Sequence, residues 1–261
     1  MTAIFTEITN VFRQDKKKSG PPTGTLYGVG VGPGDPQLVT LRALEVLGQC
    51  PVVAVPVSQP GAESYALSVV AIHLRPPEHV LLRLHFPMTR ARAERLAARR
   101  EAAQRVYAEL QAGRDVAFLT EGDPMLHSTF LHALAHLPPD TPFQVVPGVS
   151  SIAAAAAVAG VPLVDGDQRL AVLPATFEDL TRLGRTLRDF DTVVLLKVHR
   201  VLDRVIDTLT ELDLLDQAVL VERASHPSGR VVRDVASLRG RPVHYLSLLI
   251  VRSGRGGGSE D

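Results

Sequence analysis

Short apolar runs alternate with amphipathic stretches along the first half of the chain. Four apolar runs predict strands, at residues 25–31, 52–57, 80–86 and 115–120. Helical spacing of the apolar positions predicts helices between these strands, after Thr40, at residues 64–73 and at residues 89–112. Strands that alternate with helices in this way are typical of an α/β fold.

The same alternation resumes in the second half of the chain. A second block begins near Phe143 with a short strand and a helix that runs through an alanine-rich segment to Gly160. Further strands are predicted at residues 170–173, 192–197, 218–222, 230–235 and 245–251, and helices at residues 177–187 and 201–212. A Pro-rich segment, residues 137–142, separates the two blocks and predicts a domain boundary. We therefore expect α/β domains at residues 23–138 and 143–252, between flexible ends at residues 1–22 and 253–261.

Composition narrows the possible partners. Lys plus Arg and Asp plus Glu both number 28, and a chain without net charge is a poor candidate for nucleic-acid binding. Cys50 is the single cysteine, so we expect no internal disulfide and no multi-cysteine metal site. The longest apolar stretch, residues 151–164, is too short to span a bilayer. These features predict a cytoplasmic protein without a membrane or nucleic-acid partner and without a protein-bound metal.

A glycine-rich loop, residues 28–36, lies between a predicted strand and a predicted helix. At this position glycines let backbone amides approach a small ligand. The dinucleotide-binding pattern G-x-G-x-x-G fails in every register, and no Gly-Lys-Ser/Thr follows, so neither a nicotinamide cofactor nor a P-loop is favoured. The alternative is a tight turn in which Asp35 or Thr40 caps the next helix.

Two further turns join predicted strands to helices. Gly122-Asp123-Pro124 follows the buried strand at residues 115–120, and Pro147-Gly148 precedes Ser150 and Ser151 at the start of the alanine-rich helix. Ligands of α/β sheets gather at the carboxyl ends of strands, and helix N-termini offer free amides. Each turn taken alone also has a structural interpretation, because Asp and Ser are common helix caps.

The three turns, in this order and spacing, resemble the tetrapyrrole methylase family over residues 23–252. Within that family, four stretches are similar to the branch that methylates C20 of precorrin-2 or cobalt-factor II: residues 85–90 (HFPMTR), 122–130 (GDPMLHSTF), 147–157, and 195–198 followed by Arg200. Two positions depart from the family's patterns. His127 stands where Tyr is expected before Ser-Thr, and residues 55–57 (VPV) stand where the uroporphyrinogen-type relatives carry an Asp, which argues against the uroporphyrinogen enzyme.

The resemblance implies an S-adenosylmethionine-dependent methyltransferase of corrin-ring synthesis, with a two-domain, class III, non-Rossmann fold and the cofactor in the cleft between its domains. The cofactor residues that it implies are Pro33, Glu121, Gly122, Asp123, Leu126, Ser150, Ser151 and Leu196. The acceptor of such enzymes is a tetrapyrrole with several carboxylates, which arginines bind well. Our substrate-side candidates are Arg83, His85, Arg90 and Arg200. Each has the alternative of a solvated or structural charge.

Two residues are candidates for catalysis. Lys197 ends an apolar run, where a lysine either reaches solvent or points into a site. His127 is the histidine best placed to accept a proton, since its unperturbed pKa lies near 6.5, although it also fits a packing role at a helix start. Methyl transfer from a sulfonium is an in-line displacement that needs no covalent nucleophile, and the chain has no G-x-S-x-G or H-E-x-x-H motif.

Other functions remain open at this point. A sister methylase acting on another corrinoid carbon and the diphthine-synthase relative share the family's turns, but the HFPMTR and GDPMLHSTF stretches argue against both. A non-catalytic module that binds S-adenosylmethionine is a hypothesis of another class. A homodimer is an expectation from the resemblance, and whether the tetrapyrrole already carries cobalt is left open.

Overall fold

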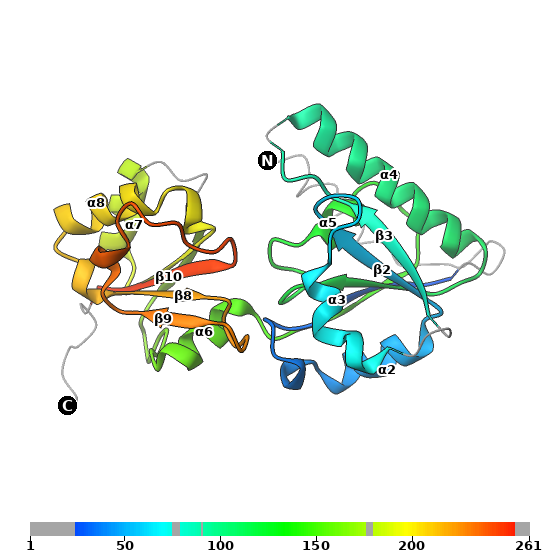
Figure 1. Cartoon of the computed structure of the whole chain (residues 1–261), viewed down its shortest axis with the longest axis horizontal. Helices are drawn as coiled ribbons and strands as arrows, with labels where there is room; N and C mark the ends of the chain where they lie inside the picture. Colours follow the sequence, from blue (N-terminus) through cyan, green and yellow to red (C-terminus); the bar gives the residue numbers. More distant parts are fainter. Residues whose placement is uncertain (1–23, 75–78, 90, 176–179, 254–261) are drawn as a thin grey trace. The chain divides into compact units, whose positions relative to one another are not determined.

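The computed structural model describes residues 24–74, 79–89, 91–175 and 180–253, with the side chains of residues 180 and 181 excepted. The extension at residues 1–22, the tail from residue 254, Arg90 and the expected start of a helix at residue 177 lie outside the described residues. The chain divides into two compact units, one ending at Ser150 and the other beginning at Ser151 (Figure 1). Each unit has a sheet of its own.

Unit 1 is built on a five-stranded parallel sheet of order β3-β2-β4-β1-β5. Its strands are β1 (Leu26–Gly30), β2 (Val52–Val57), β3 (Val80–His85), β4 (Val116–Thr120) and β5 (Phe143–Val146). The four strands predicted in the first half of the chain are all present. The strand at residues 143–146, which the sequence analysis assigned to the second block, pairs with β1 and completes this sheet.

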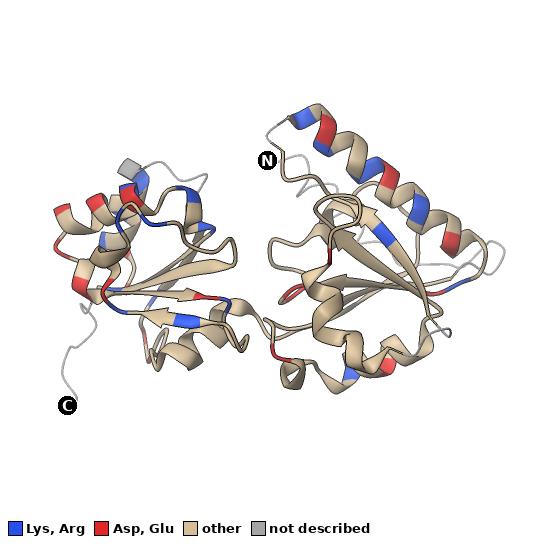
Figure 2. Cartoon of the chain, in the orientation of Figure 1, with Lys and Arg blue, Asp and Glu red and all other residues tan. Residues whose placement is uncertain are grey.

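Helices cover both faces of this sheet, as a parallel sheet requires (Figure 1). Residues of α2 (Leu41–Gln49) and α3 (Tyr65–Val70) share one buried cluster with the sheet, and residues of α4 (Arg92–Gln111) and α5 (Thr129–Leu134) share another. Ala102, Val106 and Leu110 bury one side of α4, while Lys/Arg and Asp/Glu positions are spread along its length (Figure 2). The long helix therefore carries a core stripe and a solvated face.

Unit 2 is built on a mixed sheet of order β6-β7-β10-β8-β9. Its elements are α6 (Ser151–Ala159), β6 (Leu170–Pro174), α7 (Leu180–Asp189), β7 (Thr192–Leu196), α8 (Leu202–Glu211), β8 (Ala218–Glu222), β9 (Arg230–Val232) and β10 (Ser247–Arg252). Leu183, Ile206 and Leu249 belong to one buried cluster between α7, α8 and the sheet. β9 ends earlier than predicted, because Asp234 accepts a hydrogen bond from Ser237 N at 3.2 Å and starts a 3-10 turn.

Two properties of the described residues bear on the expected partners. No described helix combines the length and the apolar character needed to cross a membrane. Within the same residues, no three His, Cys, Asp or Glu side chains come together in a way that could hold a metal ion. Cys50 is buried and unpaired, and burial raises the pKa of its thiol to about 12.

Candidate functional site

The three turns of the sequence analysis meet at one edge of the parallel sheet. β1 and β4 are neighbours in the sheet, with β2 on the outer side of β4 and β5 on the outer side of β1. The connection from β1 to β2 and the connection from β4 to β5 therefore run in opposite directions. Such a reversal is a switch point, and ligands of open α/β sheets bind in the crevice there. The loops after β1 and β4 join there through a backbone bridge between Gly32 and Gly122.

The glycines of these loops allow the chain to pack against itself. A Cβ on Gly30 would lie 2.6 Å from Gly148 N, and one on Gly148 would lie 2.1 Å from Gly122 O. Gly32 has a positive φ of 78° and exchanges hydrogen bonds with Gly122, at 2.8 Å and 3.3 Å. The three loops approach one another so closely that these positions have no room for a side chain. The glycines therefore allow the loops to pack together at the switch point.

Asp123 ties the second loop to the third. Its Oδ1 accepts a hydrogen bond from Met125 N at 2.8 Å, and its Oδ2 accepts one from Gly148 N at 3.1 Å. Pro33 of the first loop is held in a similar way, since its carbonyl accepts a hydrogen bond from the Tyr65 hydroxyl at 3.1 Å. The sequence-predicted residues Pro33, Gly122 and Asp123 therefore form one connected frame, with Ser150 two residues beyond Gly148.

Glu121 adds a second carboxyl group to this frame, directly before Gly122. The described residues give its carboxylate neither a hydrogen bond nor an ion pair, and the side chain keeps exposed surface. Surrounding protein nevertheless displaces solvent, and this desolvation raises the pKa of the carboxyl to about 7. A carboxylate without a protein partner among the described residues is suited to a ligand with positive charge.

The segment after Asp123 presents apolar surface and a strained turn. Met125 and Leu126 are 45% and 36% exposed. His127 has a positive φ of 52°, and Ser128 then caps α5 by accepting a hydrogen bond from Leu131 N at 3.3 Å. A helix start near His127 was expected from the sequence, but α5 received no bounds, because a six-residue helix carries too little periodicity.

Two substrate-side candidates of unit 1, Arg83 and His85, lie on β3, which is an outer strand of the parallel sheet. β3 is separated from β4 by β2. His85 is its last residue and so lies at the carboxyl edge, whereas Arg83 lies within the strand, with its carbonyl accepting a hydrogen bond from Arg105 Nη1 at 2.7 Å. Arg90 lies outside the described residues.

The remaining candidates belong to unit 2. Leu196 ends β7, and Lys197 follows with a positive φ of 60°. Burial lowers the pKa of the Lys197 ammonium from its usual value. Arg200 is exposed at the end of the following 3-10 turn. Ser151 begins α6.

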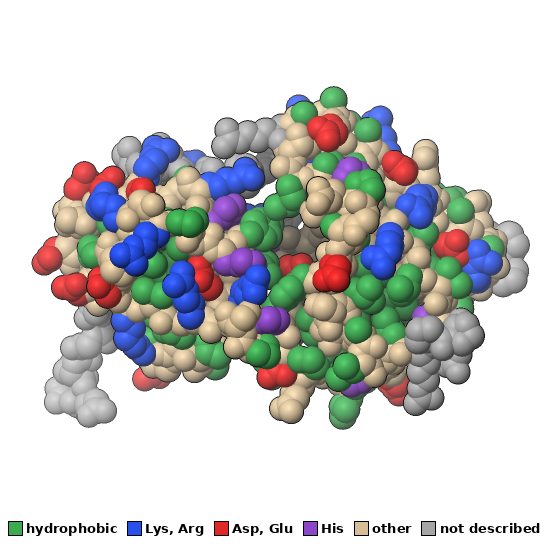
Figure 3. Space-filling model, viewed as in Figure 1, with side chains coloured by type: hydrophobic (Ala, Val, Ile, Leu, Met, Phe, Trp, Pro, Cys, Tyr) green, Lys and Arg blue, Asp and Glu red, His purple; other side chains and the backbone are tan. Residues whose placement is uncertain are grey.

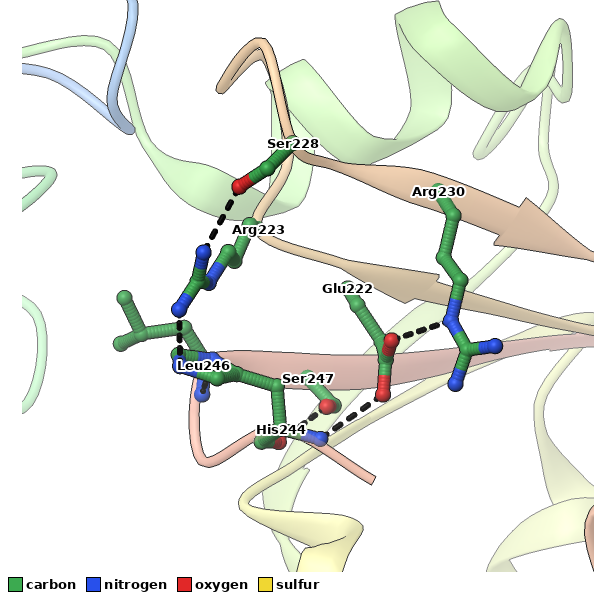
Figure 4. A network of polar contacts seen from close by, with 7 residues as sticks. All are labelled: Glu222, Arg223, Ser228, Arg230, His244, Leu246 and Ser247. Atoms are coloured by element: carbon green, nitrogen blue, oxygen red, sulfur yellow. Dashed lines mark hydrogen bonds and ion pairs between the residues drawn. The ribbon is translucent and has the colours of Figure 1, made fainter. Parts of the chain in front are cut away.

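A network next to Lys197 was missed by the sequence analysis (Figure 4). β10 runs antiparallel to β7 and β8, with Leu248 opposite Leu196 and Ser247 opposite Glu222. The residues after β7, those after β8 and those before β10 therefore share one edge of the second sheet. Arg223, Ser228 and His244 form side-chain contacts there, at 2.7 Å and 3.0 Å.

Glu222 anchors this network. Its carboxylate accepts hydrogen bonds from Arg230 Nε and from His244 N, the latter at 2.7 Å. Burial disfavours the charged form, but these hydrogen bonds outweigh burial and lower the pKa of the carboxyl. Burial and the neighbouring Arg223 charge lower the pKa of His244, with Glu222 opposing them, and burial and Arg200 lower that of His199.

A cavity of about 700 Å³ lies at the opposite end of the second sheet, beside Ala218 and Arg252. Its arginines serve the fold: Arg233 Nη2 donates to Ala159 O at 2.6 Å, and Arg252 Nη2 donates to Gln168 Oε1 at 3.2 Å. None of the sequence-predicted site residues lines this cavity.

Comparison with known proteins decides the family. The sequence profile of the Tetrapyrrole (Corrin/Porphyrin) Methylases matches residues 25–238. The chain belongs to the tetrapyrrole methylase family. The match spans both units, so the resemblance seen in the three turns is confirmed, together with the α/β class III fold.

Relatives of this tetrapyrrole methylase carry informative names. A precorrin-2 C(20)-methyltransferase of Sinorhizobium sp is 36% identical over 241 residues, which cover 89% of this chain and 97% of that protein. A cobalt-precorrin-2 C(20)-methyltransferase of Salmonella typhimurium is 35% identical over 229 residues, covering 87% and 96%. The cobalamin biosynthesis protein CobIJ of Mycobacterium tuberculosis is 39% identical over 239 residues, and the chain spans about half of its length, 46%.

A solved structure supports the same fold for the methylase. The uroporphyrin-III C-methyl transferase of Thermus thermophilus complexed with S-adenyl homocysteine aligns with a TM-score of 0.62 and 26% identity, over 88% of this chain and 98% of that one.

Proposed function

We propose that this tetrapyrrole methylase transfers a methyl group from S-adenosylmethionine to C20 of precorrin-2 or of its cobalt-containing counterpart, in corrin-ring synthesis. The observation that carries the proposal is 36% identity with a precorrin-2 C(20)-methyltransferase across 97% of that protein's length. The switch-point crevice between β1 and β4 supports it, because the family's three turns converge there.

The residues of the crevice fit the cofactor. S-adenosylmethionine combines a flat, largely apolar adenosine with a positively charged sulfonium and ammonium. Met125 and Leu126 offer apolar surface, and Glu121 offers a carboxylate without a protein partner among the described residues. We assign cofactor binding to Pro33, Glu121, Gly122, Asp123, Leu126, Ser150, Ser151 and Leu196. The cofactor supplies the methyl group, and the chain's task is to hold donor and acceptor in line.

The acceptor side is assigned to basic residues and to two residues with unusual backbone geometry. Arg83, His85, Arg90 and Arg200 are proposed to bind acceptor carboxylates. Lys197 and His127 are proposed to act near the reacting carbon, and both hold positive φ values that few non-glycine residues adopt. Transfer of the methyl to a ring carbon leaves a proton to be removed, which a neutral histidine or amine accepts.

The test is anaerobic incubation of the purified protein with S-adenosylmethionine and, in parallel, precorrin-2 and cobalt-factor II. We expect a mass gain of one methyl on a tetrapyrrole and an equal amount of S-adenosylhomocysteine, with the methyl located at C20 by carbon labelling. The acceptor that gains mass decides the metal question. Cofactor binding without methylation of either acceptor would overturn the assignment in favour of a sister methylase or a non-catalytic module.

We further propose that the protein acts in the cytoplasm as a homodimer, without a resident metal. The family resemblance supports the dimer, and the single buried cysteine suits a reducing compartment. Sedimentation at micromolar concentration distinguishes a 28.1 kDa monomer from a species of twice that mass. Elemental analysis of the purified protein tests for metal.

A further inference from the structure

Glu222 ends β8 at the loop edge of the second sheet, and its carboxylate is already paired with Arg230. Three described segments meet at this edge, residues 197–201, 223–230 and 239–246, and none of these three contains an Asp or a Glu. They carry Lys197, Arg223, His226 and His244 among other basic residues. Figure 3 shows histidine and Lys/Arg side chains gathered at the end of unit 2 that β8 reaches. An edge with this composition is suited to an anion.

Arg223 is held in place without a counter-charge. Its Nη1 donates to Ser228 Oγ at 2.7 Å, and its Nη2 lies 3.0 Å from His244 Nε2 (Figure 4). No carboxylate of the described residues pairs with it, because Glu222 is engaged by Arg230 and by His244 N. Its Nε is buried without a hydrogen-bond partner among those residues, and its φ is +47°. A merely structural arginine gains little from such an arrangement.

Hydrogen-bond roles show what this arrangement lacks. Leu246 N lies 3.0 Å from His244 Nδ1, and Arg223 Nη2 lies 3.0 Å from His244 Nε2. Both groups can only donate, whereas a neutral imidazole has a single acceptor nitrogen, so the ring satisfies one of these two donors. The other donor needs a further acceptor, and an oxygen of an anion is the acceptor that also balances the guanidinium charge.

The geometry points to a carboxylate site: we propose that Arg223 and His244 together bind a carboxylate side chain of the tetrapyrrole acceptor, so that Arg223 determines acceptor affinity. This rests on the proposed function, which supplies an acceptor with several carboxylates. Tyr245, 41% exposed with its ring 5.2 Å from that of His199, places an aromatic surface beside the site, as a flat macrocycle requires. The methionine part of S-adenosylmethionine also carries a carboxylate, and the test separates the two.

The experiment compares wild type, Arg223→Gln, Arg223→Lys and the control Arg239→Gln. Arg239 lies in the same unit, but its Nη1 already pairs with Asp207 at 2.7 Å. For each protein we measure KM for the acceptor, kcat, and the Kd of S-adenosylmethionine by calorimetry. We expect Arg223→Gln to raise the acceptor KM by a factor of about 10 to 100, with kcat and cofactor Kd within a factor of about three of wild type. Arg223→Lys keeps the charge but loses the guanidinium fork, so we expect its acceptor KM to lie between those of the wild type and Arg223→Gln.

Each outcome decides the proposal. If the acceptor KM of Arg223→Gln equals that of the wild type, the carboxylate site is overturned. The proposed function still stands in that case, provided that the wild type methylates the acceptor. A weakened cofactor Kd instead assigns Arg223 to the donor and also overturns the proposal. If Arg223→Gln does not fold, Arg223→Lys provides the test. An acceptor KM in Arg223→Lys equal to that of the wild type would contradict binding of the carboxylate by the guanidinium fork. Wild type that methylates neither acceptor removes the proposed function itself, which is a separate result.

Discussion

Gly148 N donates a hydrogen bond to Asp123 Oδ2 at 3.1 Å, across 25 positions of sequence. The contact joins the turn after β4 to the turn after β5, on the two sides of β1. The same carboxylate caps its own loop through Met125 N. One side chain thus fixes the relative position of two of the three turns that form the proposed cofactor crevice.

Replacing Asp123 by Ala removes both hydrogen bonds. We expect a loss of about 1–3 kcal/mol of stability and at least a roughly tenfold weaker affinity for S-adenosylmethionine, because two turns of the crevice separate. Denaturant unfolding and calorimetry measure the two effects. Asp234→Ala is the matched control, since Asp234 caps a single turn in unit 2. Equal loss of cofactor affinity in both variants would contradict the role assigned to Asp123.

Gly30→Ala tests the close approach of the loops. The added Cβ would lie 2.6 Å from Gly148 N and 2.7 Å from Gly122 O, and backbone atoms there cannot yield without moving two loops. We expect destabilisation of about 2–3 kcal/mol. Gly48 provides the contrast, because it lies exposed in α2 and a Cβ added to it would meet nothing within 4 Å, so Gly48→Ala should stabilise by about 0.5–1 kcal/mol. Thermal unfolding of both variants checks the difference in sign.

Glu121→Gln tests the unpaired carboxyl. Desolvation raises the pKa of Glu121 from 4.5 to about 7 in the folded state, so the folded protein binds more protons than the unfolded chain between these values. Stability from this group is therefore present below pH 4.5 and is lost as the pH rises to about 7. We expect Glu121→Gln to melt higher than wild type at about pH 8 and equally at about pH 4.5. The gain at the higher pH should be about 1 kcal/mol or less, because water still screens the exposed carboxylate.

The same group predicts a pH dependence of cofactor binding. A carboxylate that pairs with the positive charge of S-adenosylmethionine binds it better when ionised, so cofactor affinity should fall as the pH drops below about 7. Glu121→Gln should bind more weakly at about pH 8 and lose that dependence. Calorimetric titrations between about pH 5.5 and 8.5 measure both curves, and an unchanged slope in the variant would assign the effect to another group.

Cys50 gives a prediction on reactivity. The thiol is 1% exposed, and its pKa of about 12 leaves almost no thiolate at neutral pH. We expect a disulfide reagent such as 5,5'-dithiobis(2-nitrobenzoic acid) to label the native protein at least about 100-fold more slowly than the protein in about 6 M guanidinium chloride. Rapid labelling under native conditions would show that α2 opens locally.

The accuracy of the strand predictions depended on the kind of signal. β2 and β8 were predicted at their observed bounds, because continuous apolar runs of six and four residues, respectively, carry the signal of a buried strand. α5 gave no periodic signal in six residues. β5 was assigned to the second block from the Pro-rich segment before it, whereas its pairing with β1 depends on residues more than 100 positions away.

The sequence by itself determined the α/β alternation, the three strand-to-helix turns and the family, because these are local patterns of apolar spacing, glycine and capping residues. Only the tertiary structure placed the turns at one switch point, left Glu121 without a partner among the described residues and set Arg223 beside His244. The reason is that strand register is a long-range property: Ser247 stands opposite Glu222 only once β8 and β10 have paired. Residues 223–230 and 239–246 each look like an ordinary polar loop in sequence, and they join the predicted site residues Lys197 and Arg200 at one edge only after the sheet has assembled.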